Sequence, residues 1–191
     1  EWLEHERQQF RGMPDEFRAE YPASPSEAFV ALSGLVFPQF GRERHVTATD
    51  PVRWEDCIYR YAGYDLGGGD PTAIVMLGIY RRPGDPMPRA HQFGEFYRRN
   101  GAPTVEELYG YIAPWHERAP LIWVESDPRD AVVEASLRAL GLPCRTAQNA
   151  RGEGLGLVAQ WLGNDWLTIA QDCYESVNEF AGYRWATRTD V

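Results

Sequence analysis

The sequence predicts an α/β fold in which a mixed sheet, made of a three-stranded antiparallel meander plus parallel strands, is flanked by helices. Three β-prone stretches at 58–65, 72–80 and 90–97 follow one another without an intervening helix, which is typical of an antiparallel meander. From residue 104 onward, helical periodicity alternates with short apolar runs, as expected for parallel strands joined by crossover helices. With 191 residues and 43% hydrophobic residues, the chain can bury a substantial core.

The second half of the chain carries recognisable helix and strand signals. Thr104 is followed by two glutamates, which suit the first turn of a helix because they oppose its positive end. The apolar run Leu121–Val124 is typical of a short buried strand, and Gly141 is typical of a helix end. The expected elements are helices at 104–117, 129–140, 155–162 and 174–183 and strands at 121–124, 143–147 and 166–170.

Residues 1–50 lack the regularity of a domain core. We expect a broken helix over residues 1–20, followed by a proline-containing stretch from Glu20 to Phe29. We interpret residues 1–50 as a connector that packs on the adjoining domain, with a domain boundary near Asp50 and Pro51. The domain proper is then expected to span residues 51–191.

Two carboxylates frame the turn between the first two predicted strands. Asp65 ends the first strand, three glycines turn the chain, and Asp70 precedes the return strand. Carboxylates around a tight turn, with no Lys nearby, are plausible ligands for a hard cation. The alternative is that both residues are ordinary turn formers.

A second acidic pair follows the strand expected at 121–124. Glu125 and Asp127 are two residues apart, so an extended chain would direct both side chains to one face. If this strand is parallel to the one that ends at Asp65 and lies beside it, these acids converge in one cleft. Asp127 is equally suited to cap the next helix. Clustered carboxylates repel one another unless a cation lies among them, so the arrangement suggests two Mg²⁺ ions and phosphodiester hydrolysis.

Composition and missing motifs exclude several classes of function. No P-loop, GxSxG or HExxH motif occurs, and no apolar run is long enough for a membrane span. The three cysteines are widely separated, which favours reduced buried thiols over a zinc site or a disulfide framework. The net charge of −9 argues against a broad nucleic-acid-coating surface, and all 19 basic residues are Arg. DNA would therefore need a local track, for which the candidates are Arg81, Arg82, Arg89, Arg98, Arg99, Arg129 and Arg151, with the first three on a hairpin loop beside the acidic cleft.

Several of these segments resemble the nuclease part of the large terminase subunit, the DNA-packaging motor of tailed bacteriophages. The stretch Asp65–Ala73 is similar to that family's first nuclease motif, and Trp123–Pro128 is similar to the second. The stretch Glu20–Phe29 resembles the segment that links the family's ATPase and nuclease domains, and Trp166–Trp185 resembles the strand and helix before the third motif. The third acid of the family lies beyond that stretch, whereas this sequence stops at Val191.

The resemblance implies an RNase H-like fold and Mg²⁺- or Mn²⁺-dependent cleavage of double-stranded DNA, with Asp65 as central ligand and Asp70, Glu125 or Asp127 completing the site. It also implies a covalently attached ATPase domain, a small terminase subunit and a portal protein as partners, and the cytoplasm of an infected or lysogenic bacterial host as location. Because the third acid is missing, the sequence is expected to be a nuclease domain cut short. Two alternatives stay open: a non-catalytic module that holds DNA or contacts the motor, and a resolvase- or transposase-like nuclease.

Overall fold

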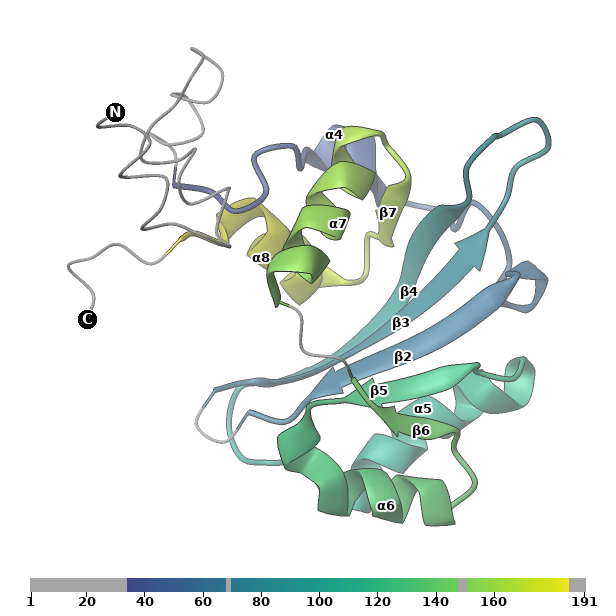
Figure 1. Ribbon diagram of the computed structural model, residues 1–191, viewed down its shortest axis with the longest axis vertical. Coiled ribbons are helices and arrows are strands. Elements are labelled where there is room, and N and C mark those ends of the chain that lie inside the picture. Colours follow the sequence, from purple (N-terminus) through teal and green to yellow (C-terminus); the bar gives the residue numbers. More distant parts are fainter. Residues whose placement is uncertain (1–33, 68–69, 148–150, 186–191) are drawn as a thin grey trace, which may run out of the picture.

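The computed structural model describes residues 34–67, 70–147 and 151–185, the side chains of residues 151 and 152 excepted. Its strands form one seven-stranded sheet in the order β1-β7-β4-β3-β2-β5-β6 (Figure 1). The strands are β1 (Val46–Thr47), β2 (Tyr59–Asp65), β3 (Thr72–Tyr80), β4 (Arg89–Arg98), β5 (Trp123–Ser126), β6 (Cys144–Thr146) and β7 (Leu167–Ala170). The α-helices are α4 (Arg42–His45), α5 (Val105–Arg118), α6 (Ala131–Ala139), α7 (Arg151–Gly163) and α8 (Tyr174–Gly182), with 3-10 turns η1 (Trp54–Asp56) and η2 (Pro128–Asp130).

The predicted meander and the parallel extension are both confirmed. Strands β2, β3 and β4 pair antiparallel in chain order, whereas β5 is parallel to β2 and β6 is parallel to β5. Strand β2 therefore lies between β3 and β5, as expected for the strand that ends at Asp65. The two strands that precede the acidic residues are neighbours and run in the same direction.

The two faces of the sheet are covered by different helices (Figure 1). One face packs against α5 and α6 around a core that includes Tyr64, Ile74, Ile112, Val124 and Leu137. The other face packs against α7 and α8 only near β3, β4 and β7, where Leu162 and Leu167 belong to a separate core. On this second face, no described helix covers the part of the sheet formed by β2, β5 and β6.

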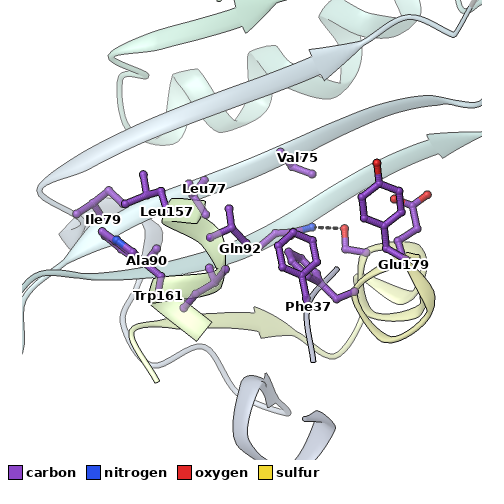
Figure 2. Close-up of a pocket in the computed structure, with 14 residues that line it drawn as sticks. Phe37, Val75, Leu77, Ile79, Ala90, Gln92, Leu157, Trp161 and Glu179 are labelled. Atoms are coloured by element: carbon purple, nitrogen blue, oxygen red, sulfur yellow. Dashed lines mark hydrogen bonds between the residues drawn. The ribbon is translucent and has the colours of Figure 1, made fainter. Parts of the chain in front are cut away.

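An apolar groove lies between α7, α8 and the sheet on this second face (Figure 2). It encloses about 480 Å³, and its floor includes Val75, Leu77 and Ile79, which alternate along β3. At one wall, the amide of Gln92 donates to the Ser176 hydroxyl at 2.7 Å.

Local signals explain where the helices begin, and three boundaries need correction. Thr104 forms a capping box with Glu107 at the start of α5, where the sequence predicts a helix start. The helix expected at 155–162 runs from Arg151 to Gly163. The helix expected at 129–140 instead begins with the 3-10 turn η2 and becomes α-helical only at Ala131. The strand expected at 121–124 runs from Trp123 to Ser126, because its parallel pairing with β2 extends two residues further.

The residues before Asp50 contribute directly to the sheet. Val46 and Thr47 form β1, which pairs parallel with β7 and which the sequence analysis did not identify. A linker spanning residues 1–50 stays a prediction, and the helix expected over residues 1–20 lies outside the described residues. All three cysteines are buried and free, as predicted. In the described part of the chain, no helix is both long and apolar enough to cross a membrane.

Candidate nuclease site

The acids of the two predicted motifs meet at the C-terminal ends of β2 and β5. Gly63 pairs with Glu125 and Tyr64 with Ser126, so Asp65 comes level with Asp127 one position further on. Because side chains alternate along strands, Asp65, Glu125 and Asp127 are directed to one face. These three residues, together with Gly63, Val75 and others, line a hollow of about 390 Å³. The predicted convergence of the two motifs is thus confirmed.

Asp127 caps a turn and also lines the hollow, so the two positions that the sequence left open are compatible. Its carboxylate accepts from the backbone N–H of Arg129 at 2.9 Å, which caps the turn η2. The same oxygen also accepts from the Arg129 guanidinium at 2.9 Å. The side chain is only 14% exposed, yet it lines the hollow beside Asp65. Capping therefore fixes the position of this carboxylate without removing it from the site.

Glu125 is held by an arginine from the neighbouring strand. Arg145 lies opposite Glu125 on β6, and its Nε donates to the carboxylate at 2.8 Å. The Arg145 guanidinium also lies over the ring of Trp123, 5.0 Å from the ring centroid. Glu125 thus belongs to a charge-paired unit on β5 and β6, whereas Asp127 lies at the strand end beside Asp65.

Asp130 joins this site although the sequence analysis did not identify it. Burial, together with the negative charges of Asp127 and Asp65, raises the pKa of the Asp130 carboxyl. Its carboxylate accepts from the N–H of Leu66 at 3.4 Å, directly after the end of β2. The available signal was spacing: residues three apart in a 3-10 turn lie on one side of it, so Asp127 and Asp130 share an orientation.

Asp70 lies across the glycine turn from these acids. It is exposed and is not among the residues that line the hollow. The turn itself is tight, because a Cβ at Gly67 would overlap the backbone carbonyl of Asp70. The turn-forming alternative therefore accounts for Gly67 and Asp70, and a ligand role for Asp70 stays a prediction.

A buried polar network lies beneath the site on the opposite face of the sheet. Glu134 on α6 is 5% exposed and accepts from the hydroxyls of Ser126 at 3.1 Å and Thr146 at 2.8 Å. It also forms an ion pair with Arg138. The network ties the ends of β5 and β6 to α6, and so it fixes the backbone between Glu125 and Asp127.

The candidate arginines lie at two different ends of the sheet. Tyr59 of β2 pairs with Ile79 and Asp65 pairs with Ala73, so the 81–88 loop lies at the end of β2 opposite Asp65 (Figure 1). The expectation that this hairpin lies beside the acids is wrong, because antiparallel strands place successive turns at opposite ends. The arginines at this far end are Arg81 and Arg82, both exposed, and Arg89, which pairs with Asp85.

Arg98 and Arg99 lie at the same end of the sheet as the acids, since Arg98 pairs with Thr72 in the β3–β4 ladder. They form ion pairs with Glu107 and Glu175, and Arg99 is 69% exposed. Arg129 belongs to the acidic site itself. Arg151 begins α7, and its side chain lies outside the described residues. DNA contacts by all the candidate arginines stay a prediction.

The carboxylates of the site can be compared with the ligands that a metal ion requires. Among the described residues, no group of three or more histidine, cysteine or acidic side chains is arranged to hold an ion. Mg²⁺ is commonly bound by one or two carboxylates, with waters and substrate phosphates completing its shell. Asp65 and Asp127 fit that minimal pattern, because both are carboxylates that line one open hollow.

Comparisons with solved structures identify the fold. The large terminase of the thermophilic bacteriophage D6E, in complex with ADP, superposes with a TM-score of 0.68 at 24% identity over 82% of this chain and 38% of its own. The nuclease domain of the P22 large terminase gives a TM-score of 0.63 at 16% identity over 80% of each chain. This chain has the fold of large terminase nuclease domains.

A third structure with this terminase nuclease fold is the nuclease domain of the SPP1 large terminase with bound Mn. It superposes with a TM-score of 0.54 at 14% identity, over 76% of this chain and 82% of its own. No protein-family model and no curated protein sequence matches the chain. The RNase H-like fold expected from the sequence is thereby confirmed. The chain spans 38% of the length of the D6E terminase.

Proposed function

We propose that this chain is the nuclease domain of a bacteriophage large terminase, and that it cleaves double-stranded DNA in a divalent-metal-dependent reaction during genome packaging. One observation carries the proposal: Asp65 and Asp127 line one hollow at the ends of neighbouring parallel strands. The shared fold supports the same function, and the bound Mn in the SPP1 nuclease domain supports a divalent cation.

In this proposal Asp65 and Asp127 hold Mg²⁺ or Mn²⁺ on the open face of the sheet. When bound, such an ion activates water for attack on a phosphodiester and stabilises the leaving oxygen. Arg129 and the N–H at the start of η2 keep the Asp127 carboxylate directed into the hollow. Asp130 adjoins this pair, and burial together with the charges of Asp127 and Asp65 raises the pKa of its carboxyl.

The proposal includes the setting in which the domain works. Large terminases join a nuclease to an ATPase, and the similarity to 38% of the D6E terminase, crystallised with ADP, supports a covalent ATPase neighbour. A small terminase subunit and a portal protein are the further partners, and the cytoplasm of the bacterial host is the location. These assignments rest on the sequence resemblance and on the fold.

A second candidate is a module with the same fold that holds DNA without cleaving it. The observation that favours it is the absence of a three-ligand group among residues 34–67, 70–147 and 151–185. The two candidates differ in one measurable outcome, which is strand scission.

The test is cleavage of a supercoiled plasmid by the purified 191-residue chain in Mn²⁺, with EDTA and Asp127→Asn as comparisons. We expect nicked and linear products that depend on Mn²⁺ and are lost with Asp127→Asn. Glu117→Gln is the control, because Glu117 is an exposed acid on α5, which packs against the opposite face. Plasmid binding without scission by the wild-type chain would favour the non-catalytic module.

A further inference from the structure

An aromatic strip lies on the same open face as the acids. Tyr61 of β2 and Trp123 of β5 are direct partners in the parallel ladder, so their side chains stand side by side on one face. Tyr59 extends the strip along β2, with its ring centroid 6.5 Å from that of Tyr61. Tyr59 is 49% exposed and Trp123 is 37% exposed, which is unusual for large rings in the middle of a sheet.

One arginine adds a third kind of planar group to the strip. Arg145 of β6 places its guanidinium over the Trp123 ring, 5.0 Å from the centroid, and its ion pair with Glu125 holds it there. This cation–π contact holds the Trp123 ring in place on the open face of the sheet, which also carries the acidic hollow.

The strip and the acidic hollow are continuous along the same two strands. The pair Tyr61 and Trp123 is followed two residues later by Gly63 and Glu125, and then by Asp65 and Asp127. The distance along β2 from Tyr61 to Asp65 is roughly 13 Å at the rise of a parallel strand. Gly63 leaves the path between the rings and the acids without a side chain, and it lines the hollow. None of the described helices packs over this path.

We propose that Tyr61, Trp123 and Tyr59 form a stacking platform for unpaired bases of a DNA strand whose backbone runs to Asp65 and Asp127. Exposed aromatic rings beside an arginine are the groups on which single-stranded bases stack, and such contacts tolerate any base sequence. Bases inside a duplex stack on one another and leave no free face, so the platform selects an unpaired or locally opened strand. The direction of the strand rests on the proposed nuclease function, whereas the binding of unpaired bases does not.

The position of the strip, rather than its composition, favours nucleic acid over a protein partner. Exposed aromatic rings and a guanidinium occur in protein–protein interfaces as well, so the choice depends on what the strip leads to. The strip ends at two carboxylates that belong to a candidate phosphodiesterase site, and a strand bound along it is placed to reach them.

The test is fluorescence anisotropy of a labelled 12-nucleotide oligothymidylate, titrated with the full 191-residue chain in EDTA so that no cleavage occurs. A blunt duplex of equal length is titrated in parallel. We expect Trp123→Ala to weaken oligothymidylate binding by about 5- to 150-fold, the range of one lost base–aromatic stack, with little change for the duplex. Trp123→Phe keeps a ring and should retain most of the affinity.

Tyr174→Ala is the matched control, because Tyr174 is 66% exposed but lies on α8, which packs at β4 on the far side of β3. Equal affinity of the wild type and Trp123→Ala for oligothymidylate would overturn the platform, as would a wild-type chain that binds only duplex. In either case plasmid cleavage in Mn²⁺ would keep the nuclease proposal. Conversely, ring-dependent oligothymidylate binding without plasmid cleavage would keep the platform and remove the nuclease.

Discussion

Neighbouring residues of β2 and β5 point to opposite faces of the sheet, and the two faces carry different kinds of side chain. On the face covered by α5 and α6, Ala62, Tyr64, Val124 and Ser126 are buried. On the open face, the intervening residues are aromatic, glycine or acidic, and they line a hollow or remain exposed. Alternation along a strand thus divides its residues into two sets. The side chains on the covered face stabilise the core, and those on the open face are available for the candidate site.

The largest expected effect comes from removing one charge on the open face. Asp65→Asn should lower Mn²⁺-dependent plasmid cleavage at least 100-fold, in line with the loss of one essential group in a preorganised electrostatic site. The exposed Asp65 contributes little to the core, so the midpoint of denaturant unfolding should hardly change. Asp70→Asn should have a much smaller effect on cleavage, because Asp70 does not line the hollow. Equal losses for the two variants would contradict this assignment of the site.

A pair of isoleucines on β3 tests the same contrast in stability. Ile74 is fully buried on the covered face, whereas Ile79 is half-buried on the other face. Ile74→Ala should lower the free energy of unfolding by about 2–5 kcal/mol, the range for a filled core position. Ile79→Ala should cost distinctly less, and urea titration of both variants measures the difference. A greater cost for Ile79 would mean that the main core lies on the other face.

The raised pKa of Asp130 predicts an effect of pH on stability. A carboxyl whose pKa is higher in the folded state than the usual 3.8 binds more protons when folded, so its contribution to stability falls as the pH rises above that value. Asp130→Asn removes this penalty, so the stability of the variant relative to wild type should be greater at pH 7 than at pH 4. Thermal unfolding of both proteins at both pH values measures the difference. A gain that is equal at both pH values would show that the Asp130 pKa is not raised.

The smallest expected effect is on the salt dependence of DNA binding, and it compares arginines at the two ends of the sheet. Arg99 lies at the end that carries the acids, whereas Arg81 lies on the loop at the opposite end. Arg99→Ala should reduce the magnitude of the log K against log [salt] slope for duplex DNA by about 0.9, the value for one phosphate contact. We expect Arg81→Ala to reduce it less. The reverse order would move the DNA track to the hairpin loop.

Much of the site could be predicted because its residues follow strands that the apolar pattern marks clearly. Asp65 and Asp127 could be brought together because each follows a strand, and the sequence analysis considered these two strands as parallel neighbours. Asp130 was missed because the sequence analysis considered only the acids that follow the strands directly and did not use the three-residue spacing between Asp127 and Asp130. The strand β1 is only Val46 and Thr47, which is too short to give a periodic pattern.

The wrong prediction for the arginines of the 81–88 loop has a different cause. The glycine turn after Asp65 lies at the acidic end, so the next turn of an antiparallel meander must lie at the other end. The sequence contained that information, and the error arose from treating proximity along the chain as proximity in space.

The most direct test of the central claim is calorimetric titration of Mn²⁺ into the 191-residue chain, its Asp65→Asn and Asp127→Asn variants and the Glu117→Gln control. If Asp65 and Asp127 hold one ion on the open face, the wild type and Glu117→Gln bind Mn²⁺ equally. Each of the two asparagine variants then loses most of the affinity, and the double variant loses little more. Binding that is unchanged in both asparagine variants would contradict the claim that these two carboxylates form a metal site.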